Sequence, residues 1–376
     1  MLSNKQSIVI CLLILLSTLL IPCFAINKQT VTVRLFEAHR PLRSLKLYPP
    51  FEIVGPDINT KITFPVLATV QENKICLNKI TPERTAIARS SSFLIRGINS
   101  GLITVASPSS QRRYCGTIIL LPDKDNSLNI VNRVPVIDYI KGVVASESPV
   151  GACPEMLKAQ AVLCQTLLDH QKSSNIIGDS TQSQCYLGAS LERPATSNAV
   201  DSVKGKMLYY NGLPIKVYFH STCAGGTSNG AQYFRLPAQT APYLHAVICN
   251  HCCHSPFWSP TQRQMCGPVF AKVFGTGLPQ IVKQDYTGRP LLLKLASGRI
   301  MSGYDFWIKL GQNFGWDKCP GTRYKLKQTV NGNIIIESTG AGHGIGLCQW
   351  GANELAKEGK TYQQILQYYF PGCELR

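Results

Sequence analysis

The chain has few acidic residues, no run of five or more basic residues and, beyond its first 25 positions, no long hydrophobic segment. It contains 21 Asp and Glu among 376 residues, against 38 Lys and Arg, so its formal net charge is +17. Because the basic residues are scattered, the charge predicts a generally basic surface and no nucleic-acid partner. The sequence also lacks internal repeats and low-complexity segments, and a hydrophobic fraction of 44% is typical of a globular protein.

The first 25 residues have the layout of a secretory signal peptide. Lys5 precedes an apolar run from Ile8 to Ile21, and the small residue Ala25 follows. The run of about 14 residues is shorter than the roughly 20 that a membrane-spanning helix needs. We therefore expect residues 1–25 to be a cleaved signal peptide, with an uncleaved N-terminal anchor as the alternative. The protein is then exported to the periplasm or cell envelope.

The chain between about residues 30 and 121 has the pattern of a β-structure. Short segments such as Val31–Phe36 alternate between apolar and polar residues, and Pro and Gly break them at the spacing of hairpins. Longer helical patterns begin only near Val134. We expect an α+β fold, in which a β-rich N-terminal region (26–130) precedes a mixed α+β domain (131–376).

Local signals also locate individual helices and turns in the second half of the chain. Pro154 and Glu155 suit the first turn of a helix, and Asn211-Gly212 predicts the turn of a β-hairpin. Thr361 and Gln364 form a capping box that opens the last helix. These signals place the chemistry-bearing residues on or beside regular elements.

Glu147 is the first candidate for a catalytic residue. It lies in a Ser-Glu-Ser-Pro segment, which we expect to be a turn between an apolar stretch ending near Ala145 and the helix beginning near Pro154. A carboxyl at such a junction suits a general acid or base, because apolar neighbours raise its pKa. It suits a solvated or capping acid equally well, and the residues alone leave both open. Asp138 and Glu155 are weaker candidates, since each has a capping role at a helix start.

Cysteine is frequent for an exported chain. Of 15 cysteines, Cys11 and Cys23 fall in the expected signal peptide, and 13 remain. Because 13 is odd, at least one thiol is unpaired, bound to metal or shared between chains.

Two clusters of histidine and cysteine are candidate metal ligands. His220 and Cys223 are separated by two residues, and Cys249, His251 and Cys252 follow close together. Two ligands from each cluster would complete a tetrahedral zinc site, which would be structural if all four positions are filled by the protein. Disulfides are the alternative, and export favours them. Both interpretations stay open.

A glycine-rich segment near the C-terminus is a candidate ligand-binding loop. It has five glycines between positions 340 and 351, with His343 among them and Gln349 and Trp350 opening a helix. No Lys or Ser/Thr follows the glycines as in a phosphate-binding loop, which excludes a nucleotide site of that kind. A loop carrying His, Gln and Trp suits a sugar-binding cleft, although a single histidine there is more often structural.

In this order, several segments resemble the sporulation stage II protein D family, which includes the amidase-enhancer proteins of bacterial cell-wall turnover. The matching pieces are VPVIDYIKGVV, the Glu147 turn, LKAQAV, SQCYLG, AVDSVKGKMLYYNGLPI, FHSTCAGG and GHGIGLCQWGANELAKEGKTYQQILQYYFPG. The resemblance runs from about Val134 to Leu375, so the expected domain 131–376 would be the family's catalytic domain.

The resemblance implies a lytic transglycosylase that acts on peptidoglycan glycan strands already stripped of stem peptides. Glu147 matches the catalytic acid in the family's Ala-Glu-Met-Pro turn. Ser148 stands where the family usually has Met, and Gln165 stands where it usually has Arg. The substrate-binding residues that the resemblance implies are Gln165, Tyr186, Ser221, His343, Gln349 and Trp350.

One carboxyl is enough for the implied reaction. Ordinary glycosidases need two, whereas Glu147 would protonate the bond between N-acetylmuramic acid and N-acetylglucosamine and then deprotonate the muramyl 6-hydroxyl. The product is a 1,6-anhydro end, and no cofactor is required, although a structural zinc is compatible with metal-binding members of the family. The alternative is a non-catalytic glycan-binding protein that recruits or stimulates an N-acetylmuramoyl-L-alanine amidase. A zinc-dependent hydrolase is a weaker third candidate, because the chain lacks the HExxH spacing.

Overall fold

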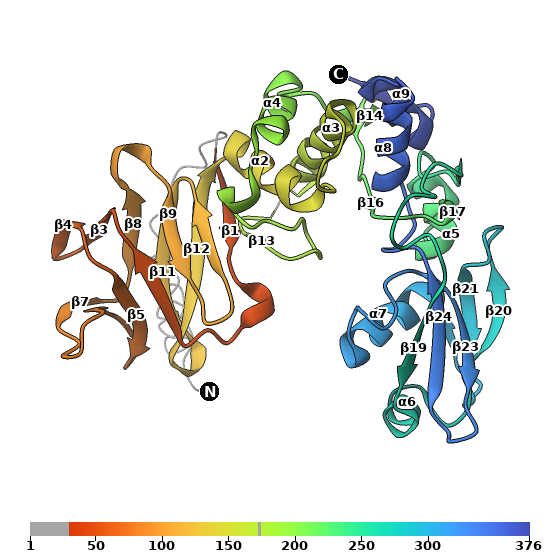
Figure 1. The fold of residues 1–376 in the computed structure, drawn as a ribbon, viewed down its shortest axis with the longest axis horizontal. Helices are drawn as coiled ribbons and strands as arrows, with labels where there is room; N and C mark the ends of the chain where they lie inside the picture. Colours follow the sequence, from red (N-terminus) through yellow and green to blue (C-terminus); the bar gives the residue numbers. More distant parts are fainter. Residues whose placement is uncertain (1–29, 172–173) are drawn as a thin grey trace, which may run out of the picture.

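The computed structural model describes residues 30–171 and 174–376. The expected signal peptide, residues 1–25, lies outside the described residues. Within them, every helix is too short or too polar to cross a membrane. The fold is mixed α+β with a β-rich N-terminal part, as the sequence predicts (Figure 1).

The N-terminal part consists of two sheets that pack on each other; their strands pair antiparallel except for β13, which joins β1 in parallel. One sheet has the order β13-β1-β12-β11-β8-β3-β4, and the other has the order β10-β9-β2-β5-β6-β7. The side chains of a strand point alternately to its two faces, which explains the packing. In β5, for example, every second residue, beginning at Val66, is buried in the core that the two sheets share. The strands are β1 (Thr30–Arg34), β2 (Ser44–Tyr48), β3 (Phe51–Gly55), β4 (Ile58–Ile62), β5 (Val66–Gln71), β6 (Lys74–Lys79), β7 (Ala86–Ser90), β8 (Phe93–Gly97), β9 (Ile103–Ala106), β10 (Gln111–Tyr114), β11 (Thr117–Asp123), β12 (Ser127–Pro135) and β13 (Ile177–Gly178).

A helical layer follows the sheets without a break in the chain. Strand β12 spans the expected boundary between residues 130 and 131 and leads directly into α2 (Val136–Glu147). Helix α2 packs against α3 (Pro154–His170) and α4 (Pro194–Ser202). Helix α3 begins at Pro154, as predicted, and its far side contacts the two C-terminal helices, α8 (Gln349–Lys357) and α9 (Tyr362–Tyr369). Segments about 200 residues apart in sequence therefore meet around α3 (Figure 1).

Short strands connect this helical layer to the C-terminal half. The predicted hairpin forms, with β14 (Leu208–Tyr210) and β15 (Leu213–Pro214) joined by Asn211-Gly212. The predicted capping box at Thr361 is also present at the start of α9. The other short elements here are β16 (Phe219–His220), β17 (Gly225–Gly226), α5 (Gly230–Phe234), β18 (Ile248–Cys249), β25 (Leu347–Cys348) and β26 (Glu374–Leu375).

Residues 261–339 form a separate module with its own hydrophobic core, drawn at the lower right of Figure 1. Its centre includes Phe270, Phe306 and Ile336, all 1% exposed or less. The chain leaves the helical layer after β18, builds this module and returns through the glycine-rich segment to β25. Its elements are β19 (Thr261–Met265), α6 (Gly267–Phe274), β20 (Gln280–Gln284), β21 (Pro290–Lys294), β22 (Ile300–Ser302), α7 (Gly303–Phe314), β23 (Arg323–Gln328) and β24 (Ile334–Thr339).

Candidate functional site

Glu147 is the last residue of α2, not part of a turn as the sequence suggested. The helix ends there because Ser148 has an extended backbone (φ −86°, ψ 144°). Pro149 explains this conformation, since a proline disfavours the helical conformation of the residue before it. The Glu147 side chain is partly buried. Its position at a helix end lets the carboxyl face loops from other parts of the chain.

A backbone amide holds the Glu147 carboxyl in place. Cys185 N donates a hydrogen bond of 2.6 Å to Glu147 Oε1. Leu187 N donates to Ser146 Oγ at 3.3 Å, so the loop that carries the SQCYLG motif is attached to the end of α2 at two points. Burial raises the pKa of Glu147, and the hydrogen bond from Cys185 opposes this effect in part. A carboxyl with a raised pKa stays protonated to higher pH, which an acid catalyst requires.

Gln349 connects the C-terminal helices to the same place. Its Nε2 donates to the carbonyl of Glu147 at 2.9 Å and to Gln160 Oε1 at 3.3 Å. Gln160 is fully buried on α3 and donates in turn to Cys164 Sγ at 3.5 Å. The end of α2 is therefore fixed by residues from α3, α8 and the Cys185 loop.

Ser148, where the family usually has Met, leaves a polar atom beside Glu147. The Ser148 side chain is 8% exposed, and its Oγ has no hydrogen-bond partner among the described residues. A buried hydroxyl without a partner is costly, so Ser148 is a candidate to bind a substrate hydroxyl or a water molecule.

Gln165 and Tyr186, two predicted substrate-binding residues, make structural contacts. Gln165 donates to the carbonyl of Val203 at 3.1 Å and accepts from Gly205 N at 2.7 Å, which ties α3 to the loop after α4. Tyr186 is 1% exposed, and its hydroxyl donates to Asn132 Oδ1 at 2.8 Å. These contacts occupy the polar atoms that would otherwise be offered to a ligand.

The other predicted substrate-binding residues gather around the parallel pair β16–β25. Trp350 N donates to the carbonyl of Ser221 at 3.1 Å, and the His343 ring lies 5.5 Å from the His220 ring. His343 Nδ1 accepts from Ile345 N at 3.1 Å. Burial lowers the pKa of His343 to about 4, so this histidine is neutral near neutral pH. This second group is joined to Glu147 through Gln349, the residue before Trp350.

Three of the five predicted metal ligands come together, and a fourth cysteine that sequence reasoning missed joins them. The Sγ atoms of Cys223, Cys249, Cys252 and Cys348 all lie within 4.8 Å of one another. Neither histidine places a ring nitrogen in this group. His220 Nδ1 is 3.1 Å from the carbonyl oxygen of Ile345 and its Nε2 is buried without a partner among the described residues, and His251 Nδ1 lies 3.0 Å from Glu358 Oε1. Cys348 stands one residue before the predicted Gln349, and its position in the sequence gave no sign of this partnership.

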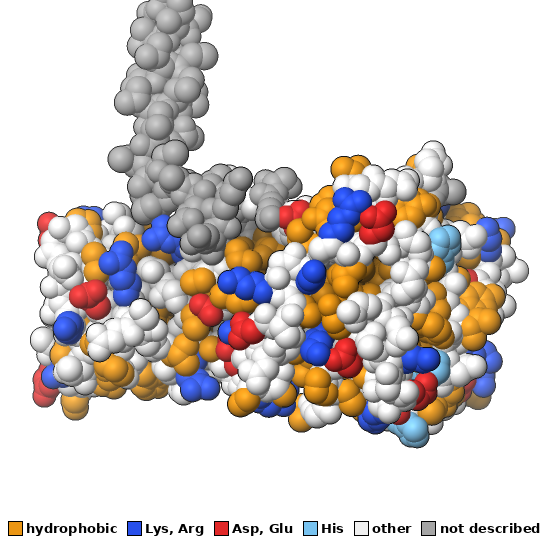
Figure 2. All heavy atoms as spheres, turned by 90° about the horizontal axis from the view of Figure 1, so that it is seen from above, with side chains coloured by type: hydrophobic (Ala, Val, Ile, Leu, Met, Phe, Trp, Pro, Cys, Tyr) orange, Lys and Arg blue, Asp and Glu red, His pale blue; other side chains and the backbone are white. Residues whose placement is uncertain are grey.

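On the face shown in Figure 2, the charged side chains are spread out. In the view of Figure 2, Lys and Arg side chains are distributed among hydrophobic and uncharged ones, without a single dominant basic patch. This agrees with the scattered basic residues in the sequence.

Comparisons with known proteins agree with the resemblance seen in the sequence. A family model described as "SpoIID: Stage II sporulation protein" matches residues 124–210, which include Glu147 and the Cys185 loop. Stage II sporulation protein D of Bacillus subtilis (strain 168) is 31% identical over 273 residues, 65% of this chain and 75% of that protein. Stage II sporulation protein D of Bacillus amyloliquefaciens is 29% identical over 288 residues, 68% of this chain and 78% of that protein.

A protein with a different printed name is also similar. The amidase enhancer of Bacillus subtilis (strain 168) is 25% identical over 293 residues, 63% of this chain and 40% of that protein. The 31% identity to the sporulation protein of Bacillus subtilis, over 75% of its length, shows that the chain belongs to the stage II sporulation protein D family.

Proposed function

We propose that this protein is a peptidoglycan lytic transglycosylase with a role in cell-wall remodelling. It cleaves the bond between N-acetylmuramic acid and N-acetylglucosamine in glycan strands that have lost their stem peptides. The observation that carries the proposal is the Glu147 carboxyl, which has a raised pKa and is held at the end of α2 by the Cys185 amide. The named relatives, a sporulation protein and an amidase enhancer, support a cell-wall role.

The hydrogen bond at Glu147 assigns a role to each carboxyl oxygen. Oε1 accepts from Cys185 N, so in the protonated acid Oε1 is the carbonyl oxygen and Oε2 carries the proton. Oε2 gives this proton to the glycosidic oxygen as the bond to C1 of the muramyl residue breaks. The resulting carboxylate takes the proton of the muramyl 6-hydroxyl as that oxygen bonds to C1. The acid is regenerated, no water is consumed, and a 1,6-anhydro end forms.

The positive charge of the chain suits this substrate. Removal of a stem peptide by an amidase leaves the lactyl group of N-acetylmuramic acid as a free carboxylate, so a stripped strand is anionic along its length. A protein with a net charge of +17 attracts such a polymer, and the attraction weakens as salt is added.

A direct assay tests the proposal. The protein is incubated with amidase-treated peptidoglycan, and the products are analysed by mass spectrometry for 1,6-anhydro-muramyl ends. We expect wild type to release them and Glu147→Gln to release at least about 100-fold less, the usual scale of acid-base catalysis. Gln keeps an oxygen that accepts from Cys185 N, so the variant is expected to fold.

Glu155→Gln is the matched control, because Glu155 lies at the start of the next helix. Its carboxylate accepts from Lys158 Nζ at 2.6 Å and Tyr362 N at 2.8 Å. Burial alone would raise the pKa of Glu155, but these bonds and the charge of Lys158 together lower it below its usual value. A group ionised in this way is no acid catalyst, so we expect activity to persist. Equal activity of Glu147→Gln and wild type would remove Glu147 from the reaction.

A glycan-binding recruiter of an amidase is the second candidate, favoured by the likeness to the amidase enhancer. If this function is the right one, wild type binds stripped strands but yields no anhydro ends. It also makes an added N-acetylmuramoyl-L-alanine amidase release more product. The same assay, run with and without the amidase, separates the two functions.

A further inference from the structure

Four buried cysteines from three separate segments meet at one point. Cys223 follows β16, Cys249 ends β18, Cys252 lies in the turn after β18, and Cys348 ends β25. Each is 0% exposed, and their Sγ atoms all lie within 4.8 Å of one another. Nothing in the proposed glycan reaction uses these thiols, so the cluster calls for an explanation of its own.

The spacing of the sulfur atoms is close to that of a tetrahedral thiolate site. With a zinc–sulfur distance of about 2.3 Å, the edges of a regular tetrahedron are about 3.8 Å long. Cys223 Sγ and Cys252 Sγ are 3.5 Å apart, and the largest separation in the group is no more than 4.8 Å. Shifts of about 1 Å or less bring all four sulfurs to a common ion.

Hydrogen-bond donors surround the cluster as they surround bound thiolates in metal sites. Cys348 Sγ accepts from Cys223 N at 3.3 Å and from Gly351 N at 3.4 Å. Cys249 Sγ lies 3.2 Å from the hydroxyl of Tyr369. Gly351 has no side chain to obstruct this approach, because a Cβ at that position would stand 2.6 Å from Cys249 Sγ. The first turn of α8 therefore delivers one backbone amide, that of Gly351, to the cluster.

We propose that Cys223, Cys249, Cys252 and Cys348 bind one zinc ion in a closed tetrathiolate centre. Four protein ligands leave no open position, so the centre is structural and takes no part in bond cleavage. Soft sulfur ligands in a tetrahedral arrangement favour zinc over the hard cations magnesium and calcium. Neither His220 nor His251, which the sequence had suggested, is a ligand.

The centre positions the candidate glycan site. It ties together the segments that carry Ser221, the 247–254 loop and the start of α8. Cys348 directly precedes Gln349, whose amide holds the carbonyl of Glu147 at 2.9 Å. Only this link to activity rests on the proposed function; metal binding by the four cysteines does not.

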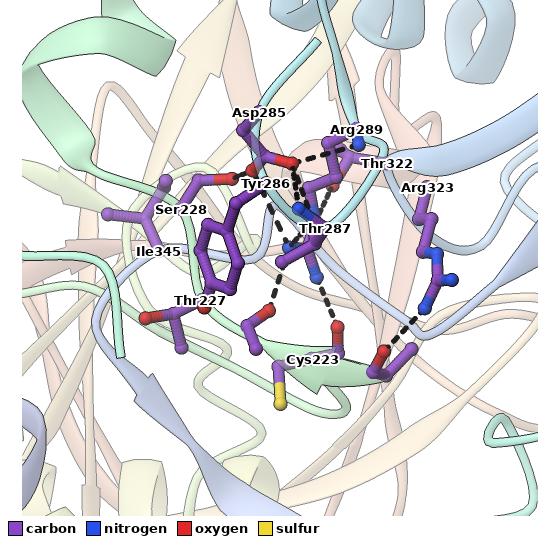
Figure 3. Close-up of polar contacts among 12 residues, drawn as sticks. Cys223, Thr227, Ser228, Asp285, Tyr286, Thr287, Arg289, Thr322, Arg323 and Ile345 are labelled. Carbon is purple, nitrogen blue, oxygen red and sulfur yellow. Dashed lines mark hydrogen bonds and ion pairs between the residues drawn. The ribbon is translucent and has the colours of Figure 1, made fainter. Parts of the chain in front are cut away.

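A buried arginine reinforces the same loop from the opposite side. Arg289, on the loop between β20 and β21, donates to the carbonyls of Cys223 and Gly226 (Figure 3). The 223–226 loop is thus held by the cysteine cluster on one side and by the 261–339 module on the other. Loss of the ion is therefore expected to loosen the loop without unfolding the module.

The test is the metal content of the full chain, purified without chelating columns and measured by inductively coupled plasma mass spectrometry. We expect about one zinc per chain in wild type and a large loss in Cys223→Ser, Cys249→Ser, Cys252→Ser and Cys348→Ser. Cys253→Ser is the matched control, because Cys253 is exposed and adjacent to a ligand. His251→Ala is the second control, and both are expected to keep the ion.

A second measurement covers variants that fail to fold. Wild type reconstituted with cobalt(II) is expected to show the visible and charge-transfer bands of a tetrahedral thiolate site. Disulfides among the four cysteines, found by peptide mass spectrometry in metal-free wild type, would overturn the proposal. So would retention of zinc in Cys348→Ser with its loss in His251→Ala. A protein that binds zinc but cleaves no glycan would refute the proposed function and leave the centre intact.

Discussion

Arg289→Met is the perturbation whose cost follows most directly from the structure. Arg289 is 1% exposed. It donates to the carbonyl of Gly226 at 2.7 Å, to Thr287 Oγ1 at 2.8 Å and to Thr322 Oγ1 at 3.2 Å, as well as to the carbonyl of Cys223 (Figure 3). Met fills much of the space of the aliphatic stem and supplies none of these donors.

The cost is set by the acceptors that lose their partner. A buried acceptor left without a donor costs about 1–3 kcal/mol, and the carbonyls of Cys223 and Gly226 are both left in this state. Asp285, the acid 3.9 Å from Arg289, keeps donors from Thr287 N and from the Arg289 backbone. The full penalty of about 3–5 kcal/mol for an abandoned buried charge is therefore not reached, and we expect about 3 kcal/mol.

Native-state hydrogen exchange measures this cost where it arises. The amides of Thr227 and Ser228 donate to the carbonyls of Val247 and Gly344 and report opening of the loop. A loss of about 3 kcal/mol corresponds to roughly 150-fold faster exchange, since 1.36 kcal/mol is a factor of ten. Thermal unfolding of the whole chain would mix the contributions of its several modules.

Arg323→Met is the matched control. Arg323 lies in the same module and donates to the carbonyl of Ala224, beside Cys223, at 2.7 Å. It is only partly buried, so water replaces the lost donor and the cost is about 1 kcal/mol or less. If both variants accelerate exchange equally, or Arg289→Met does so by less than about tenfold, the reasoning from buried acceptors is wrong.

Two further predictions concern groups near the end of α2. Because burial raises the folded-state pKa of Glu147, its contribution to stability is complete below the ordinary Glu pKa of about 4.3 and is lost as pH rises through the folded value. Glu147→Gln should therefore be more stable than wild type at pH 7 and equal to it in acid, as measured by urea unfolding at a series of pH values; a pH-independent difference would contradict this. Tyr186→Phe removes the donor to buried Asn132 Oδ1 and should cost about 1–3 kcal/mol. Native-state hydrogen exchange of the residue 186 amide, which donates to the carbonyl of Asp179, measures this cost, and unchanged exchange would show that the bond contributes nothing.

The elements predicted correctly are those whose signal is local. Pro154 begins α3, Asn211-Gly212 joins a hairpin, and Thr361 caps α9 through its own neighbours three residues away. Each depends on backbone geometry or a cap within one turn of chain. At each of these positions, the local preference and the tertiary structure agree.

The features that the sequence did not reveal depend on contacts between distant segments. The role of Cys348 follows from the parallel pairing of β16 with β25, which are separated in the chain by the 261–339 module. The Glu147 carbonyl is held by Gln349, 202 residues away. The spacing of His220 and Cys223 predicted two ligands, but only Cys223 joins the sulfur cluster, while His220 Nδ1 lies 3.1 Å from the carbonyl of Ile345.

Ser148 and Gln165 are the two positions at which the chain departs from the family pattern. For Gln165, the side of α3 on which it lies decides whether it can affect Glu147. Gln160 faces the site, because its amide oxygen accepts from Gln349, which also holds the end of α2. Gln165 is five residues further along, which rotates it about 140° around the helix, and its amide is bonded to Val203 and Gly205 instead. With an arginine at this position, Gly205 N would have no side-chain oxygen to donate to, because arginine offers no acceptor. Glutamine therefore fits the hydrogen bonds made here. Of the two departures, the one at Ser148 therefore bears more directly on the proton transfer proposed for Glu147, because its unpartnered hydroxyl belongs to the next residue in the chain.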